Sequence, residues 1–229
     1  NLLDDNPVTR IRTNLQSLVN SVGKQHRIGI RISLEQVASE DPKVQNFLLI
    51  YQDLLQAAAE GWVVLTGIES EDFGLLQDFL DNYPGIKVFL EVKSAQDLGN
   101  IVEQSPDIAG VILCGAECGG FSGEESAFTL TQKAAKLLQG TDLPFYVRGG
   151  VGPHTAAACY IAGAAGVVLQ DQLLLLPESP LPAAWQRKLE NLGGQDTHLL
   201  GINLGVSCRV LIFPKYAIGK DIYQLEKDI

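Results

Sequence analysis

Short apolar segments alternate with longer amphipathic segments along the first three quarters of the chain. Each apolar segment has the length and the β-branched content of a strand, and the segment after it has helical periodicity. Strands that are separated by helices pair in parallel, and strands that are apolar on both faces are typical of a sheet covered on both sides. The predicted strands are residues 27–33, 62–68, 87–92, 108–115, 144–151 and 165–170.

This alternation predicts an α/β protein and is compatible with two architectures. One is an open doubly wound sheet, and the other is a (β/α)8 barrel of the TIM type, either complete or truncated. We favour the TIM-barrel-like fold because of where the glycines fall. Dense glycine segments follow the fourth and fifth predicted strands, at the end of the strands where barrels carry their ligands.

The alternating pattern stops after Leu176. Three prolines within residues 177–182 indicate an extended connector, because proline neither continues a helix nor donates to a sheet. We therefore expect residues 1–176 to form the barrel and residues 177–229 to form a small C-terminal extension packed on it. The extension is predicted to hold a short helix, one strand over residues 206–213 and a charged helical tail.

Composition excludes several classes of function. The 229-residue chain carries a formal net charge of −10 and no cluster of Lys and Arg, so we expect no nucleic-acid partner. The longest nearly uncharged stretch, AAACYIAGAAGVVLQ, is too short and too rich in glycine to span a bilayer, so we expect no membrane partner and a cytoplasmic location. The chain has no methionine and starts at Asn1, which we interpret as a fragment or an excised domain of a longer protein.

The four cysteines are interpreted as reduced, buried thiols of a cytosolic protein. Cys114 and Cys118 have a C-x3-C spacing, but no second Cys or His pair follows, so no metal site is expected. His154 starts a predicted helix, and no serine or cysteine accompanies it in the arrangement of a nucleophile and its base. The residues therefore predict no catalytic group.

The fifth predicted strand ends in the turn RGGVG, residues 148–152. Gly149 and Gly150 directly before a helix could cradle a phosphate, because their N–H groups are exposed and the helix N-terminus is partly positive. They could equally form a tight turn that requires positive φ angles. Both interpretations stay open at this stage.

The fourth predicted strand ends in the loop CGAECGGFSG, residues 114–123. Gly119 and Gly120 would let a flat ring or a phosphate come close to the backbone. Glu117 could contact a ligand, but it could also cap the next helix or pair with Arg148. The last two roles are structural.

The two loops together resemble a family, the nitronate monooxygenase and 2-nitropropane dioxygenase-like flavoproteins, which include FMN-dependent enoyl reductases. The resemblance rests on the motif Gly-x-Glu-x-Gly-Gly-x-x-Gly, followed some thirty residues later by a Gly-Gly-Val turn. The continuation VVLQDQLLLLPESPLP is similar to the variant found within polyketide or polyunsaturated fatty acid synthases. The residues that fall on the two motifs are Gly115, Glu117, Gly119, Gly120, Gly123, Gly149 and Gly150.

The resemblance implies a barrel that binds FMN at its C-terminal mouth and acts as an oxidoreductase of the enoyl reductase or nitronate monooxygenase type, within a polyketide or fatty-acid synthase. An acyl carrier protein or a neighbouring synthase domain is the implied partner, and a homodimer is considered as well. The implied cofactor contacts are Gly115, Glu117, Gly119, Gly120, Gly149 and Gly150.

Two positions depart from the family pattern. The family commonly has a histidine directly after its Gly-Gly pair, but this chain has Phe121, which cannot move a proton. The second phosphate contact is usually Gly-Thr, but Gln170 and Asp171 stand here, and an aspartate repels a phosphate. A second function therefore stays open, a catalytically degenerate barrel that serves as a structural or carrier-protein docking module. A sugar-phosphate barrel enzyme would use the turn at Gly149 but would have no need of the Glu117 loop.

Overall fold

The computed structural model describes residues 28–37, 61–68 and 72–211, together with a few isolated positions near the two ends. The sequence also predicts helices in the first twenty residues and over residues 41–61. Apart from Gly61, these helices and the predicted C-terminal tail lie outside the described ranges. The chain folds as two compact units. The first comprises residues 1–91 and 103–110, and the second comprises residues 92–102 and 111–229.

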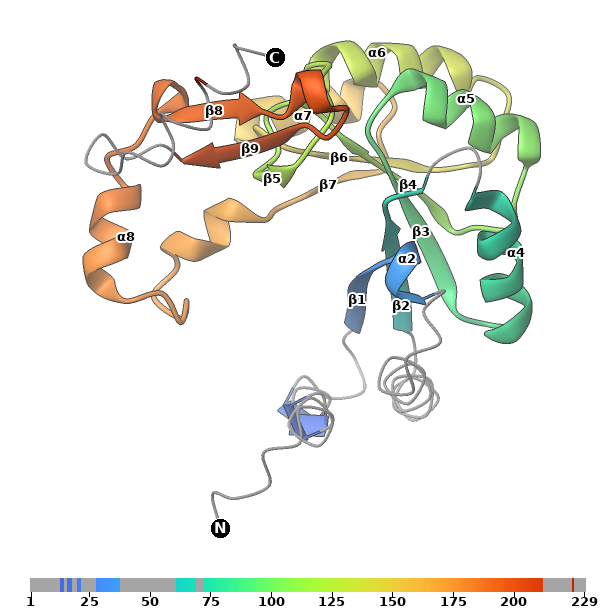
Figure 1. Ribbon diagram of the computed structural model, residues 1–229, viewed down its shortest axis with the longest axis horizontal. Helices are drawn as coiled ribbons and strands as arrows, with labels where there is room; N and C mark the ends of the chain where they lie inside the picture. Colours follow the sequence, from blue (N-terminus) through green and yellow to red (C-terminus); the bar gives the residue numbers. More distant parts are fainter. Residues whose placement is uncertain are drawn as a thin grey trace. The chain divides into compact units, whose positions relative to one another are not determined.

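The first unit contains three parallel strands in the order β1, β2, β3 (Figure 1). Ile30 pairs with Val63 in the register of β1 with β2, and Val63 pairs with Val88 in that of β2 with β3. Leu76 and Phe79 of α4 are buried at helical spacing and form the core with apolar side chains of the strands. The elements are β1 (Ile28–Ser33), α2 (Leu34–Val37), β2 (Gly61–Thr66), α4 (Phe73–Asn82) and β3 (Lys87–Val92).

The second unit continues the same alternation. β4 pairs in parallel with β6, and β6 pairs in parallel with β7. All five residues of β4 are buried, as expected of a strand covered on both faces. The elements are α5 (Ala95–Gln104), β4 (Gly110–Cys114), α6 (Ala127–Leu137), β6 (Phe145–Arg148), α7 (Pro153–Ile161) and β7 (Gly166–Val168). The predicted α/β class with parallel strands is therefore confirmed.

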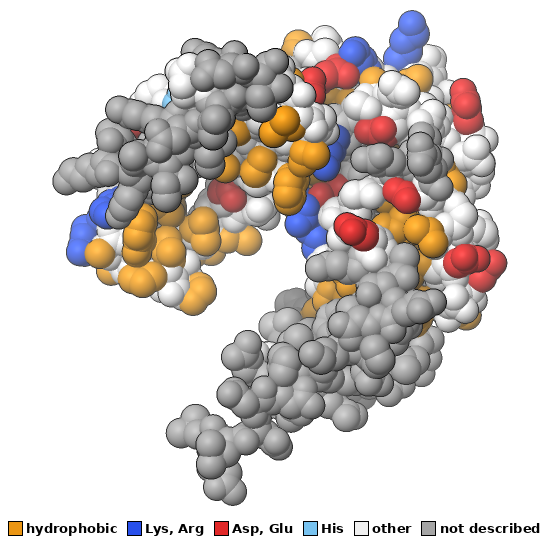
Figure 2. Space-filling model, viewed as in Figure 1, with side chains coloured by type: hydrophobic (Ala, Val, Ile, Leu, Met, Phe, Trp, Pro, Cys, Tyr) orange, Lys and Arg blue, Asp and Glu red, His pale blue; other side chains and the backbone are white. Residues whose placement is uncertain are grey.

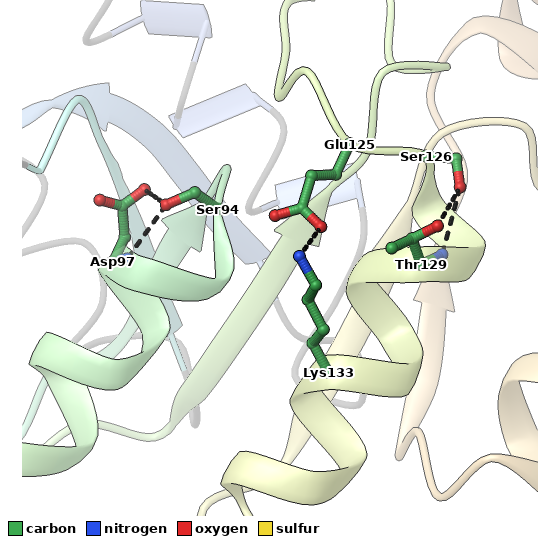
Figure 3. A network of polar contacts seen from close by, with 6 residues as sticks. All are labelled: Ser94, Asp97, Glu125, Ser126, Thr129 and Lys133. Atoms are coloured by element: carbon green, nitrogen blue, oxygen red, sulfur yellow. Dashed lines mark hydrogen bonds and ion pairs between the residues drawn. The ribbon is translucent and has the colours of Figure 1, made fainter.

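Side-chain caps fix where two helices of this unit begin (Figure 3). The Ser94 hydroxyl, just before α5, accepts a hydrogen bond from the Asp97 backbone N–H at 3.0 Å. Ser126, just before α6, accepts from the Thr129 backbone N–H at 3.2 Å. Such caps satisfy N–H groups that have no partner inside the helix. Because α6 begins at a fixed residue, the loop between β4 and α6 has a fixed length.

The segment after β7 forms short helices and an antiparallel hairpin. β8 pairs with β9, and β9 also pairs with β5, a two-residue strand in the loop that follows β4 (Figure 1). The sequence predicted one strand here, over residues 206–213, and did not predict β8 or β5. The elements are β5 (Gly120–Phe121), η2 (Asp171–Leu175), α8 (Ala183–Leu189), η3 (Gly194–Asp196), β8 (Thr197–Leu200), η4 (Ile202–Leu204) and β9 (Cys208–Leu211). Within the described ranges, no helix is long and apolar enough to cross a membrane.

Candidate functional site

A cleft of about 840 Å³ lies within the second unit, where β4, β6 and β7 end. We call it the cleft throughout. Four glycines that the sequence singled out line it, in two pairs from two loops, and Glu117 lines it beside them. Its other lining residues come from β6, β7, η2, the segment between the end of α8 and β8, and β9. These include Arg148, Val168, Gln170, Asp171, Gln172, Leu174, Leu175, Leu189, Leu192, Thr197, Arg209, Val210 and Leu211.

Glu117 holds the start of α6. Its Oε2 accepts a hydrogen bond from the Ala127 backbone N–H at 2.8 Å. A carboxylate at this position is also favoured by the partial positive charge of the helix N-terminus. Of the roles considered for Glu117, the structure shows the helix cap.

Gly115 is buried and does not line the cleft. A Cβ on Gly115 would lie 2.4 Å from the Ala127 backbone nitrogen. Glycine is therefore required here because the loop passes directly against the start of α6.

Gly149 and Gly150 make the turn from β6 to α7, with φ angles of +100° and +60°. A Cβ on Gly149 would lie 2.7 Å from both the backbone nitrogen and the Sγ of Cys118. A Cβ on Gly150 would lie 3.2 Å from the Cβ of Glu117. The tight-turn interpretation accounts for both glycines, because each has a positive φ and the turn packs against the loop after β4.

The helix that follows this turn begins with its own side-chain cap. The Thr155 hydroxyl accepts a hydrogen bond from the Gly152 backbone N–H at 2.6 Å. Pro153, at the first position of α7, has no N–H to offer. Neither residue 152 nor residue 153 therefore has a free backbone N–H for an anion at the start of α7.

The end of β7 is closed by side chains from η2. The Gln172 amide spans the opening, because its Oε1 accepts from the Gln170 backbone N–H and its Nε2 donates to the Val151 carbonyl. Asp171 reaches the glycine loop, since a Cβ on Gly119 would lie 2.6 Å from its Oδ2. A carboxylate and an amide thus occupy the space between the two strand ends.

The thiol of Cys118, which lines the cleft, has a structural partner. Cys118 is 1% exposed, and its Sγ lies 3.0 Å from the Arg148 carbonyl, to which it donates. Burial raises the pKa of the half-buried Cys159 thiol on α7, and a backbone hydrogen bond partly offsets this rise. A thiol with a raised pKa is protonated at neutral pH and is a poor nucleophile.

Comparison with solved structures gives the fold. No family profile and no curated protein matches the sequence. FabK from Thermotoga maritima superposes with a TM-score of 0.73 at 21% identity, and the match covers 98% of this chain and 64% of that one. The enoyl reductase domain of MlnA, from the macrolactin biosynthesis cluster of Bacillus amyloliquefaciens, gives 0.68 at 14% identity, covering 99% and 60%. Nitroalkane oxidase from Streptomyces ansochromogenes gives 0.62 at 16% identity, covering 90% and 66%.

The chain shares the barrel fold of these three proteins. The predicted TIM-barrel-like fold is thereby confirmed. The chain spans about two thirds of the length of these barrel structures, since its match covers 64% of FabK.

The end of β7 does not fit the phosphate that an FMN barrel would hold there. Two unit charges of one sign 4 Å apart repel by about 1 kcal/mol in water and by about 4 kcal/mol at an effective dielectric constant near 20. A phosphate at this end would meet the Asp171 carboxylate beside Gly119. It would also find the Gln170 N–H already engaged by Gln172. These residues therefore oppose a phosphate by charge and by the loss of a donor.

Phe121 is the residue that the sequence resemblance sets against a histidine of the family. Its side chain is 56% exposed, does not line the cleft, and has the Lys93 ammonium 5.7 Å from its ring centroid. In the structure, Asp171 and Gln172 are exposed side chains that line the cleft.

Sequence reasoning missed Gln172 and Arg209. The Arg209 guanidinium reaches from β9 to the loop after β4, where Nε donates to the Ala116 carbonyl, and Nη1 donates to the Thr197 hydroxyl at 2.8 Å. No local pattern could have revealed this contact, because 93 residues separate Arg209 from Ala116. Gln172 could have been suspected from its place directly after Asp171.

Proposed function

We propose that this chain is a catalytically degenerate barrel of the enoyl reductase type, which works without a flavin as a structural or carrier-protein docking module of a polyketide or fatty-acid synthase. The observation that carries the proposal is the chemistry of the β7 end, where the Asp171 carboxylate lies beside Gly119 and Gln172 engages the Gln170 N–H. The replacement of the family histidine by Phe121 supports it, since a phenyl ring can neither donate nor accept a proton. The cap that Glu117 makes on α6 supports it further, because that carboxylate already has a structural partner.

The synthase setting rests on resemblance. One of the matched structures is the enoyl reductase domain of MlnA from a macrolactin biosynthesis cluster. The sequence variant after β7 also resembles domains built into large synthases. We therefore propose an acyl carrier protein or an adjacent synthase domain as the partner, with a homodimer as a further assembly to test, and the cytoplasm as the location.

The competing function is an FMN-dependent oxidoreductase that reduces enoyl thioesters or oxidises nitronates. The cleft favours it, because Gly119, Gly120, Gly149 and Gly150 all line a space large enough for a planar cofactor. In that case the glycine loops would hold the ring, and the cofactor would supply hydride transfer.

An FMN titration separates the two functions. The purified chain is expected to be colourless and to leave the fluorescence of added FMN unquenched. The double variant Gln170→Gly with Asp171→Thr removes the carboxylate and places Gly-Thr at the second phosphate contact. It is expected to raise FMN affinity by at least about tenfold, the equivalent of 1.4 kcal/mol.

The single variant Asp171→Asn is the matched control. It removes the charge but keeps the size of the side chain, so its gain reports the electrostatic part alone. Protein that purifies with bound flavin, or that reduces an enoyl thioester with NADH, would overturn the proposal in favour of the oxidoreductase.

A further inference from the structure

The outer face of α7 is apolar and open to solvent. No residue of this helix is buried. Ile161 and Tyr160, at 85% and 75% exposed, are the two most exposed large apolar side chains among the described residues. Adjacent apolar side chains that form an exposed patch mark an interaction surface, whereas isolated ones are common on any protein. The outer face of α7 is therefore a candidate contact surface.

The region around this face carries no charge. Residues 149–170 contain no Asp, Glu, Lys or Arg, which makes them the longest such stretch in a chain of net charge −10. Of the α-helices in the described ranges, α7 alone lacks a charged residue. Figure 2 shows acidic and basic side chains over α5 and α6. The cores of protein–protein interfaces are depleted of charged residues. Two copies of an acidic chain repel each other, so a neutral face is where they can approach most closely.

The strand β7 has an open edge beside this face. It stands at the end of its sheet, pairs with β6 and, within the described residues, has no partner on its other edge (Figure 1). The helix α7 packs on β7. An open strand edge is a site at which another chain can pair. A second copy that pairs its own β7 there, antiparallel about a two-fold axis, would bring its α7 beside this one.

The residues of α7 suit a second copy of the same helix. His154, Ala158 and Ile161 are exposed and follow one stripe at helical spacing. In an antiparallel pair centred between Ala157 and Ala158, small side chains of the two helices meet in the middle and permit close approach. Ile161 of each copy then lies against the turn that holds His154 of the other, because both residues are equally far from the centre. One patch therefore supplies both sides of the contact, as two-fold symmetry requires.

We propose that this chain forms a homodimer through α7 and the open edge of β7, with Tyr160 and Ile161 as the main side chains of the contact. The inference assigns a surface to the homodimer named above, and it does not depend on whether the cleft binds a flavin. The occupant is a second copy because the patch is neutral and self-complementary. It has no charge that would select a partner of the opposite sign.

Sedimentation velocity of the full chain between about 1 and 100 μM tests the assembly, and a dimer is expected at the upper concentrations. A rise in salt from about 50 to 500 mM should leave the dimer intact or strengthen it, because salt screens the repulsion between two acidic chains. A contact held by ion pairs would instead weaken as the salt concentration rises.

Two aspartate variants locate the contact. Ile161→Asp places one carboxylate from each copy in the dimer interface, so we expect the dissociation constant to rise at least about hundredfold. Leu204→Asp in η4 is the matched control, because Leu204 is 62% exposed in the same unit and lies outside the proposed contact. It should change the dissociation constant by less than about twofold. Thermal melting of both variants checks that they are folded.

A cysteine crosslink tests the geometry with little change to the contact. Ala157→Cys places a thiol beside the two-fold axis, so mild oxidation is expected to give a disulfide-linked dimer. Leu204→Cys is one control. The parent chain is the other, because it already has the half-buried Cys159 on α7. Neither control should crosslink as Ala157→Cys does.

Four outcomes would overturn the proposal: a monomer at every concentration, a dimer that weakens at high salt, equal effects of the two aspartate variants, or equal crosslinking of the two cysteine variants. A monomer would leave the α7 face to a partner other than this chain. FMN titration of the same protein reports on the flavin alone, so failure of the dimer and failure of the proposed function are separate results.

Discussion

The turn after β6 and the turn after β7 stand at neighbouring strand ends of one unit, yet their chemistry differs. The first turn keeps the glycine pair of the family, Gly149 and Gly150, with positive φ angles. The second carries Gln170 and Asp171, and the Gln172 side chain joins the two turns through hydrogen bonds with the Gln170 N–H and the Val151 carbonyl. Gly149 and Gly150 pack against the loop after β4. This packing is enough to require glycine at both positions, because an added Cβ would meet Cys118 or Glu117. Packing by itself therefore accounts for this glycine pair, without a ligand.

The largest effect is expected from Gly149→Ala. The substitution places a Cβ 2.7 Å from Cys118 and forces alanine into a φ of +100°, so we expect a loss of roughly 3 kcal/mol of unfolding free energy. Urea denaturation measures it. Gly152→Ala is the control, because Gly152 has φ −132° and the nearest atom to its Cβ is 3.9 Å away, and it should cost less than about 1 kcal/mol. Equal costs for the two variants would show that packing does not explain the retained glycine.

An intermediate effect is expected from Gln172→Ala. Removal of the amide leaves the Gln170 N–H and the Val151 carbonyl without the bonds that join the two turns, at a cost of about 1 kcal/mol. Urea denaturation again supplies the measurement. Gln77→Ala on the exposed face of α4 is the control and should change stability by less than about 0.5 kcal/mol. If both variants cost the same, the bridge between the turns contributes nothing measurable.

The smallest effect is expected from Thr155→Val at the first turn of α7. It removes the acceptor of the Gly152 N–H, and water can replace it at this exposed position, so we expect a loss of about 0.5 kcal/mol. Thr155→Ser keeps the hydroxyl and should match the parent chain in thermal melting. Equal losses for the valine and serine variants would show that the hydroxyl cap contributes nothing measurable.

The fold was predictable because its signals are local. Apolar segments such as residues 87–92 alternate with amphipathic helices, and this period specifies parallel strands without knowledge of any distant contact. The candidate loops were located from glycine density at strand ends, and the structure places Glu117, Gly119 and the Gly149 pair around one cleft.

The remaining features depend on contacts between distant residues. β5 has two residues, one of them glycine, and exists because β9 pairs with it. β8 is four residues long, and within the described residues it pairs only with β9. A segment this short has too few alternating residues for its sequence to predict a strand. The Asp171 contact with Gly119 likewise joins loops that are far apart in sequence.

The attachment of β9 to the loop after β4 has a consequence for the order in which the molecule assembles. Hydrogen bonds of Ser207 with Ser122 and of Arg209 with Ala116 span 85 and 93 residues. Contacts of such long range form slowly, because the chain loses loop-closure entropy before the contact stabilises it. During synthesis the parallel strands emerge first, and the hairpin emerges only after them. The side chains of β9 that line the cleft are therefore absent from the nascent chain until residues 207–211 have been made. Binding of a ligand that contacts them would show that the second unit is complete.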